Sequence, residues 1–87
     1  MNRFSVTETQ FNTNGAIAHS SIDYGTDEAG ALSHFHMALA SGIASSLVAV
    51  TVTLNSFDED GRGWSRSETV KGTGIYTLLV EEGGNEE

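Results

Sequence analysis

The alternation of apolar and polar side chains in residues 47–57 constrains the fold of this chain more than any other feature. The segment reads LVAVTVTLNSF, and β-branched residues dominate it. Successive side chains of a strand point to opposite faces of a sheet, so a period of two predicts a strand here. The apolar positions are Val48, Val50, Val52 and Leu54, which alternate with Ala49, Thr51 and Thr53.

Further strands are predicted on both sides of this segment. Residues 3–11 are rich in Thr, Val and Phe, and residues 16–24 follow after Asn14-Gly15. Asn-Gly is the strongest short hairpin signal, because a type I′ turn needs positive φ at both central positions. Residues 64–70 are a fourth predicted strand, after the polar turn DEDGRG. The apolar residues 75–80, IYTLLV, are predicted to be a fifth strand or an arm that pairs with another subunit.

One helix is predicted between the second and third strands, from residue 27 to about residue 42. Thr26 can cap it, and Asp27 and Glu28 place negative charge in the first turn, where the helix dipole favours acids. Glycine often follows a helix terminus, so Gly42 indicates where the helix ends. At about 100° per residue, the face predicted to meet the sheet carries Leu32, His36, Leu39 and Ile43.

This order of elements predicts an α+β two-layer sandwich, ββαββ(β), in which one antiparallel-rich sheet carries one helix on one face. The 87 residues suit a single domain, which we place at residues 1–80. The last seven residues, EEGGNEE, are predicted to be a disordered acidic tail. Because one helix covers one face of the sheet, the other face is expected to be solvated or buried against a second copy.

Composition excludes several kinds of partner. There is no cysteine, so neither a disulfide nor a thiolate metal site can reinforce the fold, and oligomerisation remains a common reinforcement. Twelve acidic residues against four basic ones give a net charge of −8 at pH 7, which disfavours binding to nucleic acid or to an anionic membrane. The first residues have no apolar core typical of a signal peptide, and no run of about 20 apolar residues occurs. These features fit the cytosol.

The longest uncharged stretch runs from residue 29 to residue 57 and contains the predicted helix. A solvated helix usually presents Lys and Glu on its outer side, whereas small residues let another surface approach. We therefore predict a homo-oligomer interface, with a mild Ala/Ser face exposed to solvent as the alternative. The residues predicted for this interface are His34, Ala38, Ser41 and Ser45 on the helix, and Ile75, Tyr76 and Leu78 after the fourth strand.

Two of the three histidines lie two residues apart, at His34 and His36. On a helix this spacing turns them about 200° apart, so they cannot chelate one metal. His36 falls on the predicted inner face, where it is either a buried core residue or part of a ligand pocket with Tyr24. His34 is predicted to point outward. We expect no metal site and no cofactor.

The remaining candidate site is the basic–aromatic cluster of Arg62, Trp64 and Arg66. Such a cluster can stack a nucleotide base or bind an acidic peptide, and a tryptophan that packs at the start of a strand is the alternative. An EF-hand alignment on Gly61 lacks strong ligands at two positions, so the acidic turn is predicted to be a hairpin loop. No nucleophile motif occurs, and we predict that the chain is not an enzyme.

Residues 14–68 resemble small proteins encoded in phages and prophages of Gram-positive gut bacteria. The similarity covers about two thirds of the chain and leaves out the segment after Val70. It implies a phage origin and names no activity. The features that carry the resemblance are Gly15, Phe35-His36, Leu39-Ala40, Ser45-Ser46, the strand from Val48 to Leu54, and the turn from Asp58 to Gly61.

Size, acidity and the uncharged helix together favour a non-enzymatic, phage-encoded accessory protein that binds a partner in the cytoplasm of the bacterial host. The expected role is inhibition of a bacterial defence system, either by occluding a protein surface or by sequestering a small nucleotide signal. The alternative is a homo-oligomeric structural component of the virion or of tail assembly.

Overall fold

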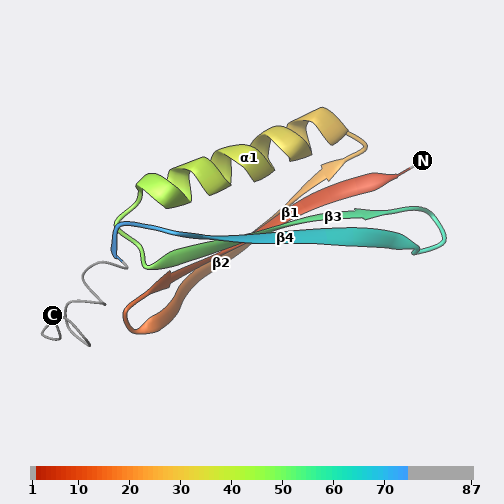
Figure 1. The fold of residues 1–87 in the computed structure, drawn as a ribbon. Coiled ribbons are helices and arrows are strands. Elements are labelled where there is room, and N and C mark those ends of the chain that lie inside the picture. Colours follow the sequence, from red (N-terminus) through yellow and green to blue (C-terminus); the bar gives the residue numbers. More distant parts are fainter. Residues whose placement is uncertain (1, 75–87) are drawn as a thin grey trace, which may run out of the picture.

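The computed structural model describes residues 2–74, and the predicted strand at residues 75–80 and the predicted tail lie outside this range. The chain forms the predicted α+β two-layer sandwich, with four strands and one helix in the order ββαββ (Figure 1). The elements are β1 (Arg3–Asn12), β2 (Gly15–Gly25), α1 (Glu28–Ala44), β3 (Ala49–Phe57) and β4 (Gly63–Lys71).

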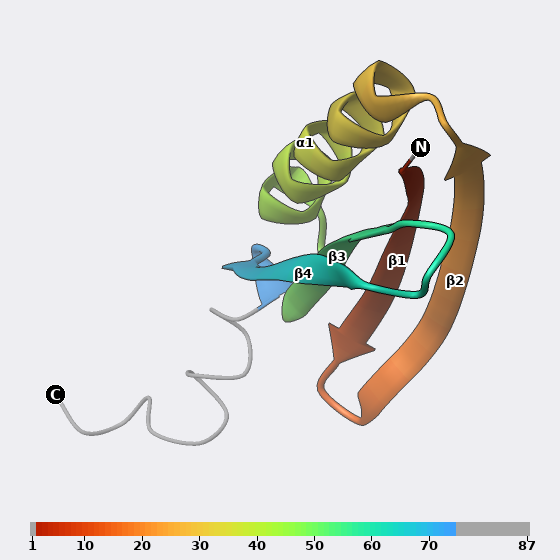
Figure 2. The same cartoon turned by 90° about the vertical axis from the view of Figure 1, so that its right-hand side faces the viewer.

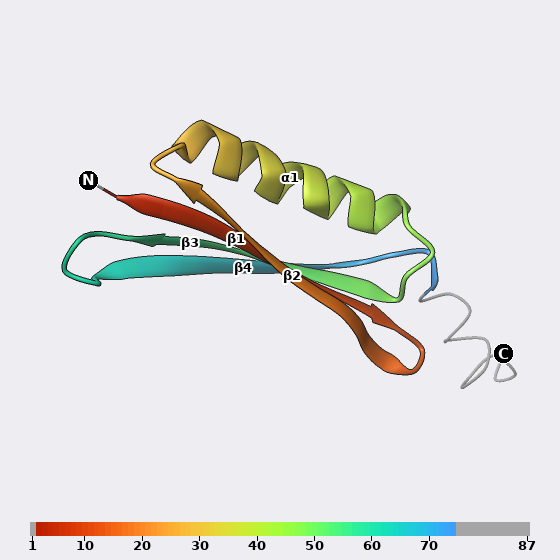
Figure 3. The same ribbon diagram turned by 180° about the vertical axis from the view of Figure 1, so that it is seen from behind.

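The four strands form one antiparallel sheet in the order β2-β1-β3-β4. β1 and β3 are therefore central, while β2 and β4 are the two edges. The helix connects β2 to β3 and crosses one face of the twisted sheet (Figures 2 and 3). In the middle of the register, Val6 lies opposite Ile22 on one side and Leu54 on the other, and Leu54 in turn lies opposite Arg66.

Both hairpins close through local polar contacts. In the first, the amide of Asn14 donates to Asn12 Oδ1 at 2.8 Å, and Gly15 has a φ of 110°. Asn14 does not have positive φ, so the predicted hairpin is confirmed but the predicted type I′ geometry at Asn14-Gly15 is wrong. In the second, Asp58 Oδ1 accepts from the amides of Asp60 and Arg62, which explains the acidic turn as a hairpin loop.

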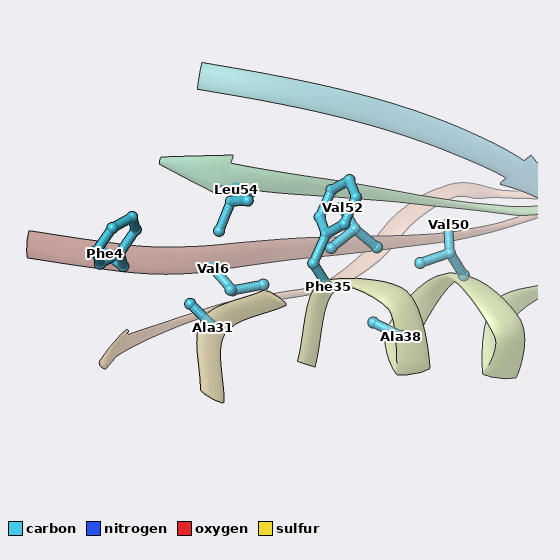
Figure 4. Close-up of a cluster of buried hydrophobic side chains, with 8 residues drawn as sticks. All are labelled: Phe4, Val6, Ala31, Phe35, Ala38, Val50, Val52 and Leu54. Atoms are coloured by element: carbon cyan, nitrogen blue, oxygen red, sulfur yellow. The ribbon is translucent and has the colours of Figure 1, made fainter. Parts of the chain in front are cut away.

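The core is a cluster of aliphatic side chains and two phenylalanines between α1 and the two central strands (Figure 4). Val50, Val52 and Leu54 are buried, as the alternation of β3 predicts, and Val6 joins them from β1. Phe35 projects from α1 toward Val52 and is fully buried. The remaining buried apolar residues are Phe4, Ala31 and Ala38.

The inner face of α1 differs from the predicted one. The buried helix positions are Ala31, Phe35, Ala38 and Gly42, whereas His36 and Ile43 are exposed. The predicted inner face, with Leu32, His36, Leu39 and Ile43, is therefore wrong, because α1 is rotated about its axis relative to that prediction. Leu32 and Leu39 pack only at the margin of the core. Gly42 explains the difference, because a Cβ there would lie 2.9 Å from Val70 Cγ2 and 3.0 Å from Val50 Cβ. The small residues let the helix approach the sheet closely, and Phe35 fills the remaining space.

The start of the helix lies one residue later than predicted. Asp27 is the N-cap, and its Oδ1 accepts from the amide of Gly30 at 2.9 Å. Thr26 therefore does not cap the helix. At the other end Ser45 is the C-cap, and its amide donates to the carbonyl of Gly42.

Candidate binding surfaces

A polar cluster joins the helix to the first hairpin. The Tyr24 hydroxyl lies 2.8 Å from His34 Nδ1, and the two rings meet edge to face with centroids 5.6 Å apart. His34 Nε2 lies 3.9 Å from Glu8 Oε1, and Gln10 donates to the other oxygen of Glu8 at 3.1 Å. His34 is only about one-fifth exposed, so the prediction that it points outward is wrong. These contacts hold the His34 side of α1 against β1 and β2.

A shallow pocket opens beside this cluster. Its volume is about 350 Å³, and it is lined by Tyr24, Gly30, Ser33, His34 and Met37. Tyr24 was predicted to share a pocket with His36, but the structure pairs it with His34 instead. In the tautomer with the proton on Nε2, His34 Nδ1 accepts a hydrogen bond from the Tyr24 hydroxyl, and the Nε2–H is directed toward Glu8. A ligand in this pocket would meet hydrogen-bonding groups that their neighbours hold in place.

His36 lies on the opposite flank of α1, next to β4. Its ring meets the Phe35 ring edge-on at 5.3 Å, and Arg66 Cζ lies 5.2 Å from the centroid of the same Phe35 ring. His36 is exposed, so the prediction that it lies in the core is wrong. Arg66 covers the buried phenylalanine and also meets Glu68 at 3.4 Å. Its position is therefore explained in part by packing.

Trp64 lies beside a larger hollow at the end of the β3–β4 hairpin. Trp64 is 51% exposed and shares the helix-facing side of β4 with Arg66, while Arg62 stands in the turn just before the strand. Gly63 allows the strands to approach, because a Cβ there would overlap the Ser56 carbonyl oxygen. The hollow has a volume of about 530 Å³ and is lined by Ser5, Asn55, Ser56, Phe57, Gly61, Gly63, Trp64 and Ser65.

The predicted interface residues do not form one surface. Ala38 is buried against the sheet, and the part-buried Ser45 donates from its hydroxyl to the Gly42 carbonyl at 2.7 Å. Ser41 is exposed, as predicted. Ile75, Tyr76 and Leu78 lie outside the described residues. The exposed side of α1 after Glu28 is nevertheless uncharged, and it consists of Ala29, Ser33, His36, Met37, Ala40, Ser41, Ile43 and Ala44.

The face of the sheet opposite the helix is covered by hydroxyl-bearing side chains that pair across neighbouring strands. Thr51 meets Thr69 at 2.8 Å, and Thr53 meets Ser67 at 2.7 Å. Further pairs join the other strands, namely Thr7 with Ser21, Thr9 with His19 and Ser65 with Asn55. The alternation of Thr and Ser with apolar residues in the sequence was the signal for this face. None of these residues was among the predicted binding or interface residues.

One ion pair bounds this hydroxyl face. Arg3 Nη2 lies 3.1 Å from Asp23 Oδ2, and the amide of Gly25 donates to Asp23 Oδ1 at 2.8 Å. These two contacts, the backbone hydrogen bond first and the guanidinium second, lower the pKa of Asp23 below its usual value.

Within residues 2–74 no group of three or more His, Asp or Glu side chains is arranged to hold a metal ion. Among the described elements there is also no helix with the length and apolarity needed to cross a bilayer. Comparisons with protein-family models, with curated proteins and with solved structures find no match to this chain.

Proposed function

We propose that this chain is a non-enzymatic accessory binding protein of phage or prophage origin. It acts as a homo-oligomer in the host cytoplasm and inhibits a bacterial defence system by occluding a protein surface. The observation that carries this proposal is the half-exposed Trp64 at the start of β4, on the helix-facing side of the strand.

Trp64 has the properties of an anchor for a protein partner. Tryptophan, tyrosine and arginine dominate the binding energy of protein interfaces, mostly where an aromatic side chain fills a pocket surrounded by polar groups. Trp64 projects on the helix-facing side of β4, opposite Ser56, whereas the neighbouring Phe57 points to the other side of the sheet. Ser5 and Ser65 line the hollow from that other side. Arg62 precedes the strand in the same turn. This end of the hairpin therefore combines an exposed aromatic side chain with the polar residues of the turn.

The charges in the same turn favour a protein surface over a nucleotide. The turn that contributes Gly61 to the hollow also contains Asp58, Glu59 and Asp60. Three carboxylates repel phosphate groups. Arg66 is engaged with Phe35 and Glu68. A basic surface on the partner complements this turn, as expected of an inhibitor that covers a protein groove.

The test compares Trp64→Ala with Met37→Ala, a matched removal of an exposed apolar side chain on a different surface. The tagged wild-type protein should recover a host defence protein from infected cells, and direct titration should show binding about 30-fold weaker for Trp64→Ala, or about 2 kcal/mol. Met37→Ala should bind as the wild type does. Undiminished binding by a folded Trp64→Ala variant would contradict the proposal.

The second candidate function is a structural component of the virion or of tail assembly. The open edges β2 and β4 at opposite sides of the sheet favour it, because head-to-tail pairing of unlike edges produces an open-ended array. Ile75, Tyr76 and Leu78 remain predicted contacts in such an array. Recovery of virion proteins alone from infected cells, together with assemblies that grow with concentration, would favour this function over the inhibitor.

A further inference from the structure

The two edges of the sheet differ in how they are protected from pairing with another strand. Natural proteins block an edge with charged residues, proline or bulges. β4 carries Arg66, Glu68 and Lys71, whereas β2 has neither lysine nor proline and pairs regularly with β1 between its two register shifts, over residues 18–23. The only charged residue of β2 is Asp23, which is bound to Arg3 at one end of the strand. Every residue of β2 from Gly15 to Asp23 is exposed.

The surface next to the β2 edge is apolar and uncharged on the helix side. Ile22 is 46% exposed and points to the same side of the sheet as Val6, its partner on β1. Met37, 66% exposed, lines the pocket formed by α1 and Tyr24. A strand added at this edge would cover Ile22 and bring further apolar surface toward Met37.

We propose that a second copy of this chain pairs with this edge. The two β2 strands run antiparallel about a two-fold axis that is perpendicular to the sheet and passes through Ser20. The two four-stranded sheets then join into one sheet of eight strands, with both helices on the same face. The proposal rests on the homo-oligomer of the proposed function and identifies its interface.

Symmetry restricts the register of this pairing. An axis perpendicular to the sheet keeps each residue on its own face, and residues directly opposite one another also share a face. The numbers of opposite residues add to a constant, and this sum must be even for the two residues to share a face. One residue therefore lies opposite its own copy, at the axis. The regular part of β2 lies between two register shifts, which occur opposite Phe4/Ser5 and opposite Gln10/Phe11. Ser20 is near the middle of this part and is also the midpoint of Gly15–Gly25.

An axis at Ser20 gives complementary pairs on both faces. On the helix side Ala18 lies opposite the partner's Ile22, which covers that exposed side chain. On the other side His19 lies opposite the partner's Ser21, so the hydroxyl pairs of the sheet continue across the junction. An axis at Ser21 instead places Ile22 opposite the partner's Ser20, so that the exposed apolar side chain meets a hydroxyl.

Charge also favours a second copy as the occupant. Each chain carries a net charge of −8, so two copies associate only where their surfaces are locally neutral. Residues 15–22 of β2 carry no formally charged side chain apart from the titratable His19. The central pairs, residues 18–22, are thus neutral, while Asp23 lies opposite the partner's Ile17 and is bound to Arg3. The edge is also self-complementary, as a two-fold interface requires.

The test uses the full chain with Ser20→Lys and Ser20→Glu, separately and mixed. Like charges directly opposite each other at the axis of the interface should weaken self-association at least about tenfold in each single variant. An equimolar mixture should restore the dimer, because lysine then faces glutamate. Ser67→Lys adds the same charge to the β4 edge and should leave the dimer unchanged. Light scattering at micromolar concentration measures the mass, and circular dichroism checks the fold.

The outcomes separate this inference from the proposed function. A dimer unaffected by Ser20→Lys, or two monomeric variants that do not combine when mixed, would overturn the Ser20 interface. A monomeric wild-type protein would overturn both this interface and the homo-oligomer. Binding of the host partner through Trp64 would stand in either case, because Trp64 lies on β4, at the opposite edge of the sheet.

Discussion

His34 and His36 are two positions apart but differ in what they contribute to the fold. His34 bonds to the Tyr24 hydroxyl at 2.8 Å and is part-buried, whereas His36 is exposed beside Phe35. We expect His34→Ala to lower the free energy of unfolding by about 1 kcal/mol, since one hydrogen bond and its packing are lost. His36→Ala should change it by less than about 0.5 kcal/mol. Urea titration of both variants measures the difference, and a larger effect at His36 would contradict these roles.

Asp23 gives the stability of the chain a defined dependence on pH. Its folded pKa lies below the usual value of 3.8, so the ionised carboxylate stabilises the fold at pH values above about 4. This contribution is lost as the pH falls through the folded pKa. Asp23→Asn should therefore be less stable than the wild type at pH 7, and the difference should disappear at lower pH. Arg3→Gln should remove only part of it, because the Gly25 amide remains.

At the scale of the helix, Gly42 allows α1 to approach the sheet. Alanine at this position would raise the intrinsic helix propensity by about 1 kcal/mol, but its Cβ would press on Val50 and Val70 at about 3 Å. Overpacking typically costs about 1–3 kcal/mol, so we expect Gly42→Ala to be destabilised overall. Ser41→Ala, on the exposed side of the same turn, should be slightly more stable than the wild type. Thermal unfolding of the two variants tests this, and a stabilised Gly42→Ala would contradict the close packing.

At the scale of the whole molecule, net charge controls self-association. Two chains of −8 each repel one another at long range, while the proposed β2 junction contains no ion pair. Salt screens this repulsion, with a Debye length of about 8 Å at physiological ionic strength. The dimer should therefore become tighter as salt is added from a low concentration. Sedimentation at several salt concentrations measures this, and a dimer that salt weakens would point to ionic contacts instead.

The elements of the fold were predictable because their signals are local. The alternation in residues 47–57 depends only on the two faces of a strand, and β3 buries Val50, Val52 and Leu54 accordingly. The hairpin after β1 and the helix after Gly25 follow from turn and capping chemistry within a few residues. The resulting two-layer order of strands and helix is the part of the structure that the sequence by itself determined.

The rotation of α1 and the grouping of polar side chains were decided only by tertiary structure. The predicted stripe followed the helical spacing of Leu32, Leu39 and Ile43, but the helix packs on the sheet through Gly42, Ala38 and the Phe35 ring. That rotation turns His34 toward Tyr24 and turns His36 toward solvent. The strand order likewise decides which hydroxyls meet across the open face. These outcomes depend on distances between segments far apart in the chain, which no local pattern of residues encodes.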